Sequence, residues 1–239
     1  MIRRAFTQQL DHDPDFQWRG DQVTRIENLS DIVFALAFSM IVTASDIPFT
    51  LDGIRLYLVS IVPVSAAFAV MLVTWNRHFL FFRRYGLADN RIVWLNALLL
   101  LTILSIAYPL RFIFESLFAY ILLVFGNLDL ILRIGLDSYE SAGEVVCYFG
   151  LIFSVLQLLF ARMYARALEK RDTLQLSAIE IDVSRQALWS FRIGIALGLI
   201  AAVCAYYTVL GPFSGFIISL STPMRWLLQY NIRSANNHG

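Results

Sequence analysis

The chain of 239 residues has little charge and few of the residues that build covalent or catalytic sites. Only 15% of its residues are charged, against about 25% in an average soluble domain. It has two cysteines, and both stand inside apolar runs, where cysteine behaves as a small hydrophobic residue rather than a disulfide partner. Because 58% of the residues are hydrophobic and fall in long blocks, the composition excludes an ordinary soluble domain.

Other absences narrow the function. No Lys/Arg cluster is interleaved with aromatic residues, so we expect no nucleic-acid partner. No spacing of Cys, His, Asp or Glu suggests a metal, and no serine has a nearby His–Asp arrangement that would make it a nucleophile. We therefore expect a protein that is not an enzyme and holds no cofactor.

What the chain does have is apolar windows long enough to cross a membrane, which takes about 20 residues. Six are present, at residues 28–47, 54–75, 91–110, 142–163, 187–209 and 212–229. The sequence thus predicts an all-α, polytopic membrane protein with six transmembrane helices per subunit. Residues 1–24 form an N-terminal tail, 25–230 the membrane domain and 231–239 a C-terminal tail.

Residues 112–126 are also apolar, apart from Glu115 and Ser116, and follow Pro109 closely. About fifteen residues are short for a span. We expect a kinked extension of the third helix or an interfacial segment, since a seventh span would break the charge asymmetry of the loops.

The basic residues predict the orientation. Sixteen of the nineteen lie before the first window, between the second and third, around the fourth-to-fifth connection, or near the C-terminus. The other three are Arg55, Arg111 and Arg133. By the positive-inside rule both termini are cytoplasmic, which requires an even number of spans. The predicted location is the cell membrane.

An arginine, a serine and an aspartate, Arg25, Ser30 and Asp31, stand at the start of the first apolar window. Ionisable groups at a membrane boundary are a functional-site hypothesis by default. The polar residues predicted at the same depth on other helices are Trp75, His78 and Asn96. They are candidate partners for Ser30 and Asp31, in a cluster that either joins helices or acts directly.

The first window also has a distinct face. At about 100° per residue, Leu36, Met40 and Thr43 share one face, with Ile32 and Ser39 on its flank. Asp31 lies about 140° from Leu36. If the Leu36 face lines a central axis, Asp31 points back into the bundle.

These residues resemble a known family. The segment resembles the Arg-x-x-x-Phe-Ser-Asp motif of the bacterial transmembrane-protein-175 family of potassium channels, with Arg25 followed after three residues by Leu29-Ser30-Asp31. That family is related to the endolysosomal potassium channel of animals. Trp75-x-x-His78 and the stretch 95–100 with Pro109 are also similar. The likeness covers residues 22–110, with Leu29 in place of the usual phenylalanine.

The resemblance implies a homotetramer whose first helices line the pore, with bulky apolar residues forming the constriction. By position these are Leu36, Met40 and Thr43, of which the last two depart from the family's aliphatic residues. Members lack the Thr-Val-Gly-Tyr-Gly filter of other potassium channels, and this chain contains no such segment.

The function we expect is a weakly selective channel for potassium and other monovalent cations in a lipid bilayer. A ring of Leu36 would strip or distort an ion's hydration shell, which favours weakly hydrated potassium. Asp46 either attracts cations at the outer mouth or is a solvated helix end. The alternatives are a secondary transporter or permease, and a non-conducting membrane scaffold.

Overall fold

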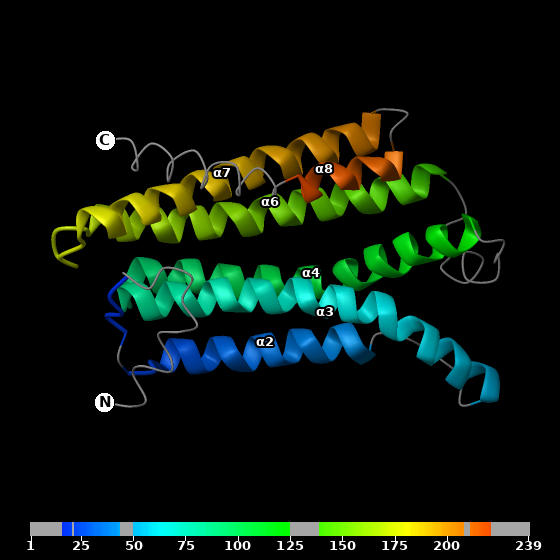
Figure 1. Ribbon diagram of the computed structural model, residues 1–239, viewed down its shortest axis with the longest axis horizontal. Helices are drawn as coiled ribbons and strands as arrows, with labels where there is room; N and C mark the ends of the chain where they lie inside the picture. Colours follow the sequence, from blue (N-terminus) through cyan, green and yellow to red (C-terminus); the bar gives the residue numbers. More distant parts are fainter. Residues whose placement is uncertain (1–15, 21, 44–49, 125–138, 208–210, 221–239) are drawn as a thin grey trace.

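Five long helices dominate the computed structural model, which describes residues 16–20, 22–43, 50–124, 139–207 and 211–220 (Figure 1). They are α2 (Arg25–Thr43), α3 (Leu51–Tyr85), α4 (Asn90–Val124), α6 (Tyr139–Glu169) and α7 (Ala178–Tyr207). A 3-10 turn, η1 (Gly211–Ser214), and a short helix, α8 (Gly215–Ser219), follow. Within these ranges there is no strand.

Each of the five long helices is long and apolar enough to cross a membrane. The predicted all-α, multi-pass membrane fold is therefore confirmed. The sixth predicted window, 212–229, contains most of η1 and all of α8, and its residues after 220 lie outside the described ranges. The sixth span stays a prediction.

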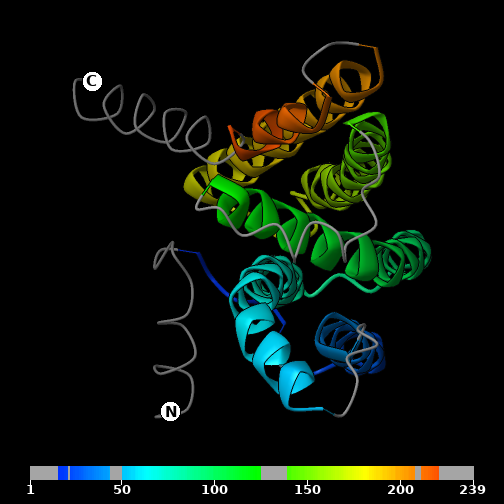
Figure 2. The ribbon, with the colours of Figure 1, turned by 90° about the vertical axis from the view of Figure 1, so that its right-hand side faces the viewer.

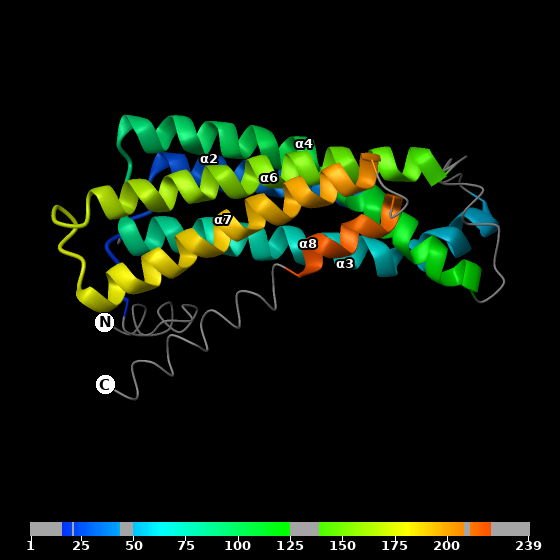
Figure 3. The same cartoon turned by 90° about the horizontal axis from the view of Figure 1, so that it is seen from above.

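The apolar stretch after Pro109 continues the third predicted helix, because α4 runs without a break through that proline to Val124. A second proline, Pro63, stands inside α3. A proline inside a helix removes one backbone hydrogen bond and favours a bend. The first turns of α3 and the last turns of α4 diverge from each other (Figures 1 and 3).

The helices form three layers with α4 in the middle. α4 packs against α2 and α3 on one side and against α6 on the other, and α6 packs against α7 (Figure 2). At one end of the bundle α2, α4 and α7 begin while α3 and α6 end (Figure 1). We call this the motif end, because the Arg25–Asp31 segment lies there.

Small residues bring α6 and α7 into close contact. A Cβ atom added at Gly198 would overlap the hydroxyl of Ser154, and one at Gly150 would lie 2.7 Å from the backbone oxygen of Gly198. Membrane helices, which gain little from apolar burial against each other, associate through such close approaches. Any larger side chain at Gly198 would separate the two helices.

Residues 16–20, part of the predicted tail, pack on the motif end. The Arg19 guanidinium forms an ion pair with Glu180 of α7 at 2.8 Å, and the Arg19 amide donates to the backbone oxygen of Arg83 at 3.1 Å. Phe16 is buried, edge-on to the ring of Tyr85. This segment joins the end of α3 to the start of α7.

Candidate functional site

The first membrane helix, α2, has one face buried inside the subunit. Its members recur every three or four residues and are Glu27, Ser30, Phe34, Ala37 and Ile41. Such spacing places them in one row along a helix. This row packs α2 against α3 and α4.

The opposite side of α2 carries an exposed row that we call the open stripe. It consists of Arg25, Leu29, Ile32, Leu36, Ser39 and Thr43, all exposed in the subunit. The spacings alternate between four and three residues, the period that lets parallel helices meet along a seam. Leu29, Ile32 and Leu36 are 56%, 68% and 52% exposed, so half or more of each large apolar side chain has no cover within the described subunit.

The structure separates the three residues that the resemblance assigns to the constriction. Leu36 and Thr43 lie on the open stripe, whereas Met40 is half-buried and packs partly against the core. A step of four residues turns about 40° around the helix, which carries Met40 toward the packed side. Ile32, which the sequence places only on the flank of the Leu36 face, is the most exposed large apolar residue of the stripe.

The hydroxyl of Thr43 has a partner inside its own helix. It donates to the backbone oxygen of Ser39 at 2.8 Å. The Thr43 oxygen keeps lone pairs free to accept a hydrogen bond or contact a cation. The open stripe therefore changes along its length from apolar side chains to hydroxyl groups.

A buried chain of hydrogen bonds joins α2 to α3 and α4. The Asn96 amide of α4 donates to the Ser30 hydroxyl at 3.0 Å, and its oxygen lies 2.8 Å from Nε2 of His78 on α3. Since an amide oxygen only accepts, Nε2 carries the proton. Ser30 in turn donates to the backbone oxygen of Ile26 at 2.8 Å. Ser30, His78 and Asn96 are all buried.

Asp31 makes a separate contact on the side of α2 that faces α3. The indole nitrogen of Trp75 donates to its carboxylate at 2.9 Å. Asp31 itself remains exposed in the subunit. It thus points toward the α2–α3 boundary and away from the open stripe, while part of the carboxylate stays accessible.

Arg25 and Leu29 do not join these contacts. Both are exposed, and in the described ranges the Arg25 side chain has no hydrogen bond or ion pair with Ser30 or Asp31 or with their partners. The reason is helical phase, since both residues share the row of Ile32 and Leu36. Asp46, the predicted outer-mouth carboxylate, lies outside the described residues.

Sequence reasoning missed the residue that holds the far end of α2. Arg111 of α4 is buried and donates through Nη1 to the backbone oxygens of Ile41 and Val42 at 2.8 and 3.0 Å. Its Nε pairs with Glu115 at 2.8 Å. Basic groups favour the last carbonyls of a helix. The Arg-x-x-x-Glu spacing inside an apolar stretch is the signal that could have revealed it.

A second missed contact holds the start of α2. The Glu27 amide donates to the Thr24 hydroxyl at 3.3 Å, and the Thr24 amide donates to the Glu27 carboxylate at 3.0 Å. This reciprocal arrangement is a capping box. Glu27 is buried and pairs with Arg83 of α3 at 3.2 Å. The Thr-x-x-Glu pattern before an apolar run could have revealed this cap.

No group of three or more His, Cys, Asp or Glu side chains in the described ranges could hold a metal ion. The arrangement defines a class: a multi-pass membrane protein whose first spanning helix is fixed to its neighbours on one side and presents an uncovered row on the other.

Comparison with known proteins extends this description. Residues 25–106 match the family model of the endosomal/lysosomal potassium channel TMEM175. A potassium channel of Marivirga tractuosa is 31% identical over 229 residues, which cover 93% of each chain. The crystal structure of a variant of the potassium channel MtTMEM175, in complex with a nanobody–MBP fusion protein, has 30% identity and a TM-score of 0.79, covering 93% of this chain and 98% of that one. The chain belongs to the TMEM175 family of potassium channels, which agrees with the expectation that it is not an enzyme.

Proposed function

We propose that the protein is a weakly selective potassium channel whose pore is lined by the open stripe of α2. The observation that carries this proposal is the contrast between the two sides of α2, one packed and hydrogen-bonded to α3 and α4, the other uncovered and running from apolar to hydroxyl side chains. α2 has 19 residues, about 28 Å of helix, which matches a hydrocarbon core of about 30 Å.

The stripe supplies two environments for an ion. Leu29, Ile32 and Leu36 present no oxygen atoms, so a cation that passes them must keep or partly lose its water without replacement by the protein. This favours the more weakly hydrated potassium over sodium, and an apolar constriction can also close by dewetting. Ser39 and Thr43 then offer hydroxyl oxygens, so that level is wetter and discriminates less.

A closed path needs several copies of α2, because a single stripe encloses nothing. We propose the homotetramer that the family resemblance implies, with the four stripes facing a common axis. The alternating spacing of the stripe supports this arrangement, since it is the period at which neighbouring helices pack along a seam. Leu36 is the proposed narrowest level, with Ile32 one turn closer to the motif end.

The proposed location is the cell membrane with both termini in the cytoplasm. The support is the excess of basic residues at the motif end, where Arg83, Arg91, Arg166 and Lys170 all lie near helix ends. Asp46 is proposed to attract cations at the opposite mouth. A C-terminal reporter that appears outside the cell would contradict this orientation.

The alternatives have less support. A secondary transporter is expected to show internal repeats and broken helices at mid-membrane, but α2, α6 and α7 are continuous in the described ranges and the charges gather near one end. A non-conducting scaffold needs no uncovered stripe. The test is flux of potassium and sodium into liposomes that hold the purified protein: channel function predicts faster potassium uptake without any driving ion, and no flux above empty liposomes contradicts it.

A further inference from the structure

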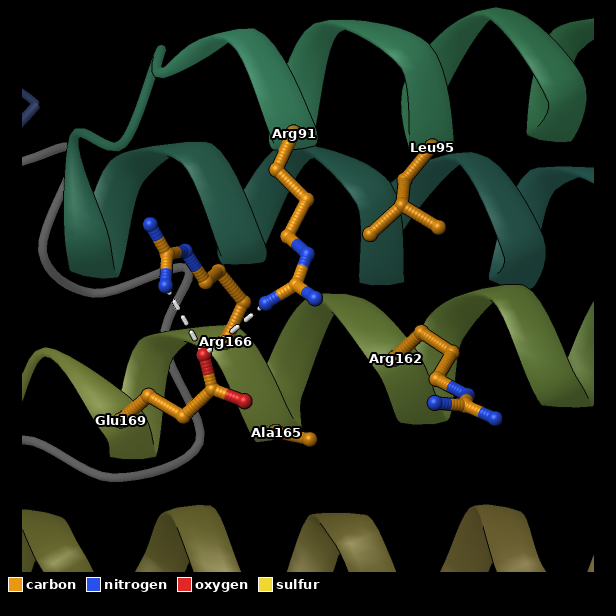
Figure 4. A pocket seen from close by; sticks show the side chains of 6 residues that line it. All are labelled: Arg91, Leu95, Arg162, Ala165, Arg166 and Glu169. Carbon is orange, nitrogen blue, oxygen red and sulfur yellow. Dashed lines mark hydrogen bonds and ion pairs between the residues drawn. The ribbon is translucent and has the colours of Figure 1, made fainter.

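A cavity of about 230 Å³ lies between α4 and α6 at the motif end, away from the open stripe of α2. It is lined by Arg91 and Leu95 of α4 and by Arg162, Ala165, Arg166 and Glu169 of α6 (Figure 4). The lining thus contains three guanidinium groups and one carboxylate. Neither the ion path nor the hydrogen-bonded chain of Ser30 uses any of these residues.

The ion pairs of the cavity leave an excess of positive charge. Glu169 pairs with Arg166 at 2.8 Å and with Arg91 at 3.2 Å. Asp89 pairs with Arg166 at 2.8 Å and with Lys170 at 3.0 Å. With Arg162 added, four cationic side chains face two carboxylates, which gives this corner a net charge of +2.

Arg162 is the cation that these carboxylates do not neutralise. It is exposed, and in the described part of the chain its guanidinium has no ion pair or hydrogen bond. Figure 4 shows its guanidinium apart from the ion pairs of Glu169. Arg91 is also exposed and shares Glu169 with Arg166. Two guanidinium groups are therefore accessible to an anion.

The residues beside the cavity are of the kind expected where lipid headgroups meet acyl chains. Trp94, which is 66% exposed, lies next to Leu95 in the chain, and exposed tryptophans favour membrane interfaces. Further along the same faces the helices expose large apolar residues. These are Leu98 and Leu101 of α4 and Leu158, Val155 and Leu151 of α6.

We propose that this cavity binds the phosphate group of an anionic phospholipid from the leaflet at the motif end, with the acyl chain along the exposed residues of α4 and α6. Guanidinium groups match phosphate oxygens in geometry and charge. Basic pockets between membrane helices on the cytoplasmic side are known headgroup sites. A free phosphate would use the same arginines but gain nothing from Leu98 or Leu158, so the apolar continuation favours the lipid.

The test is the affinity of the purified full-length protein for phosphatidylglycerol and for phosphatidylcholine of the same chain length, measured by native mass spectrometry in zwitterionic micelles. We expect tighter binding of phosphatidylglycerol, and binding about fivefold weaker in Arg162→Gln, the effect of one basic residue at an anionic surface. Among the described residues Arg162 has no hydrogen bond or ion pair to lose, so we expect the variant to keep its fold, which circular dichroism checks.

Arg185→Gln is the matched control, because Arg185 is an exposed arginine of α7 near the same end whose one ion pair within the described ranges is with Asp182, at 3.6 Å. It should bind phosphatidylglycerol as the wild type does. Equal losses in the two variants, or no loss in Arg162→Gln, would overturn the site. Inorganic phosphate that displaces the lipid at equal concentration would overturn its assignment to a lipid. The readout is binding, so it is independent of whether the protein conducts ions.

Discussion

The guanidinium of Arg111 donates to the backbone oxygen of Ile41 over 2.8 Å, so a side chain of α4 holds the last turn of α2. Near the other end of α2, Asn96, which like Arg111 belongs to α4, donates to Ser30 over 3.0 Å. The two contacts are eleven residues apart along α2, about 16 Å. α2 is therefore hydrogen-bonded to α4 near both of its ends, which holds the open stripe in place against the rest of the subunit.

Arg111→Gln should loosen the last turn of α2. The variant loses two charge-assisted hydrogen bonds and leaves Glu115 without its partner, and hydrogen bonds of this kind contribute about 1.5–3 kcal/mol each. Hydrogen exchange of the backbone amides at residues 41–43 should become faster, with a lower Tm. Arg55→Gln is the control, because the Arg55–Asp52 pair is exposed on both sides and contributes about 0–1 kcal/mol. Unchanged exchange in Arg111→Gln would show that α2 is held by other contacts.

Asn96→Ala should destabilise the subunit through Ser30 as well as directly. A double-mutant cycle with Ser30→Ala should give a coupling energy of about 0.6 kcal/mol and at most about 1.7 kcal/mol, the average and maximum for hydrogen bonds between membrane helices. Reversible unfolding in micelles measures it. Thr102→Ala is the control, because that hydroxyl donates within its own helix, to the Leu98 backbone oxygen. A coupling energy near zero would mean that the Ser30–Asn96 bond does not contribute to stability.

Asp31→Ala should lower tetramer stability or yield more than it alters ion preference, since Asp31 contacts Trp75 and faces away from the open stripe. Trp75→Phe keeps an aromatic side chain but removes the indole N–H donor, so it should reproduce most of the loss, and the double variant should be little worse than either. Size-exclusion chromatography and flux assays together measure both effects. A variant of Asp31 that assembles normally and changes only selectivity would place Asp31 in the ion path.

Acid should weaken the motif end through Asp89, in the turn before α4. Partial burial alone would raise the pKa of this carboxyl, but hydrogen bonds from Arg166, the Ile92 amide and Lys170 lower it from 3.8 to about 2. A carboxyl whose pKa is lower in the folded state than in the unfolded state stabilises the fold at pH values above its unfolded-state pKa. That stabilisation is lost as the pH falls through its folded-state pKa. Part of the stability should thus disappear between pH 4 and 2 in the wild type. In Asp89→Asn, the free energy of unfolding should change less between pH 4 and 2 than in the wild type.

The sequence predicts the fold well because apolar length and loop charge are properties of single segments. It also places Trp75, His78 and Asn96 at the depth of Ser30 and Asp31, where the structure has their hydrogen bonds. Helical rotation separates Asp31 from the Leu36 face as expected, but it does not assign every residue of the motif and of the constriction to its face. Arg25 and Leu29 belong to the motif in sequence but lie on the open stripe, and Met40 turns toward the core, because small differences in helical phase decide which face a residue joins. The Arg-x-x-x-Glu spacing signals the pair of Arg111 with Glu115, but the backbone oxygens of α2 that Arg111 also bonds carry no signal in the sequence.

The most direct test of the proposed pore is the ratio of potassium to sodium flux in liposomes for Leu36→Asn. The Leu36 side chain is half exposed on the open stripe, and the amide group of an asparagine at this level would bring water to the driest part of the path. We predict higher total flux and a lower potassium-to-sodium ratio than in the wild type, with a much smaller change in Thr43→Ala, where a hydroxyl already attracts water. If folded Leu36→Asn protein keeps both the flux and the ratio of the wild type, α2 does not line the pore.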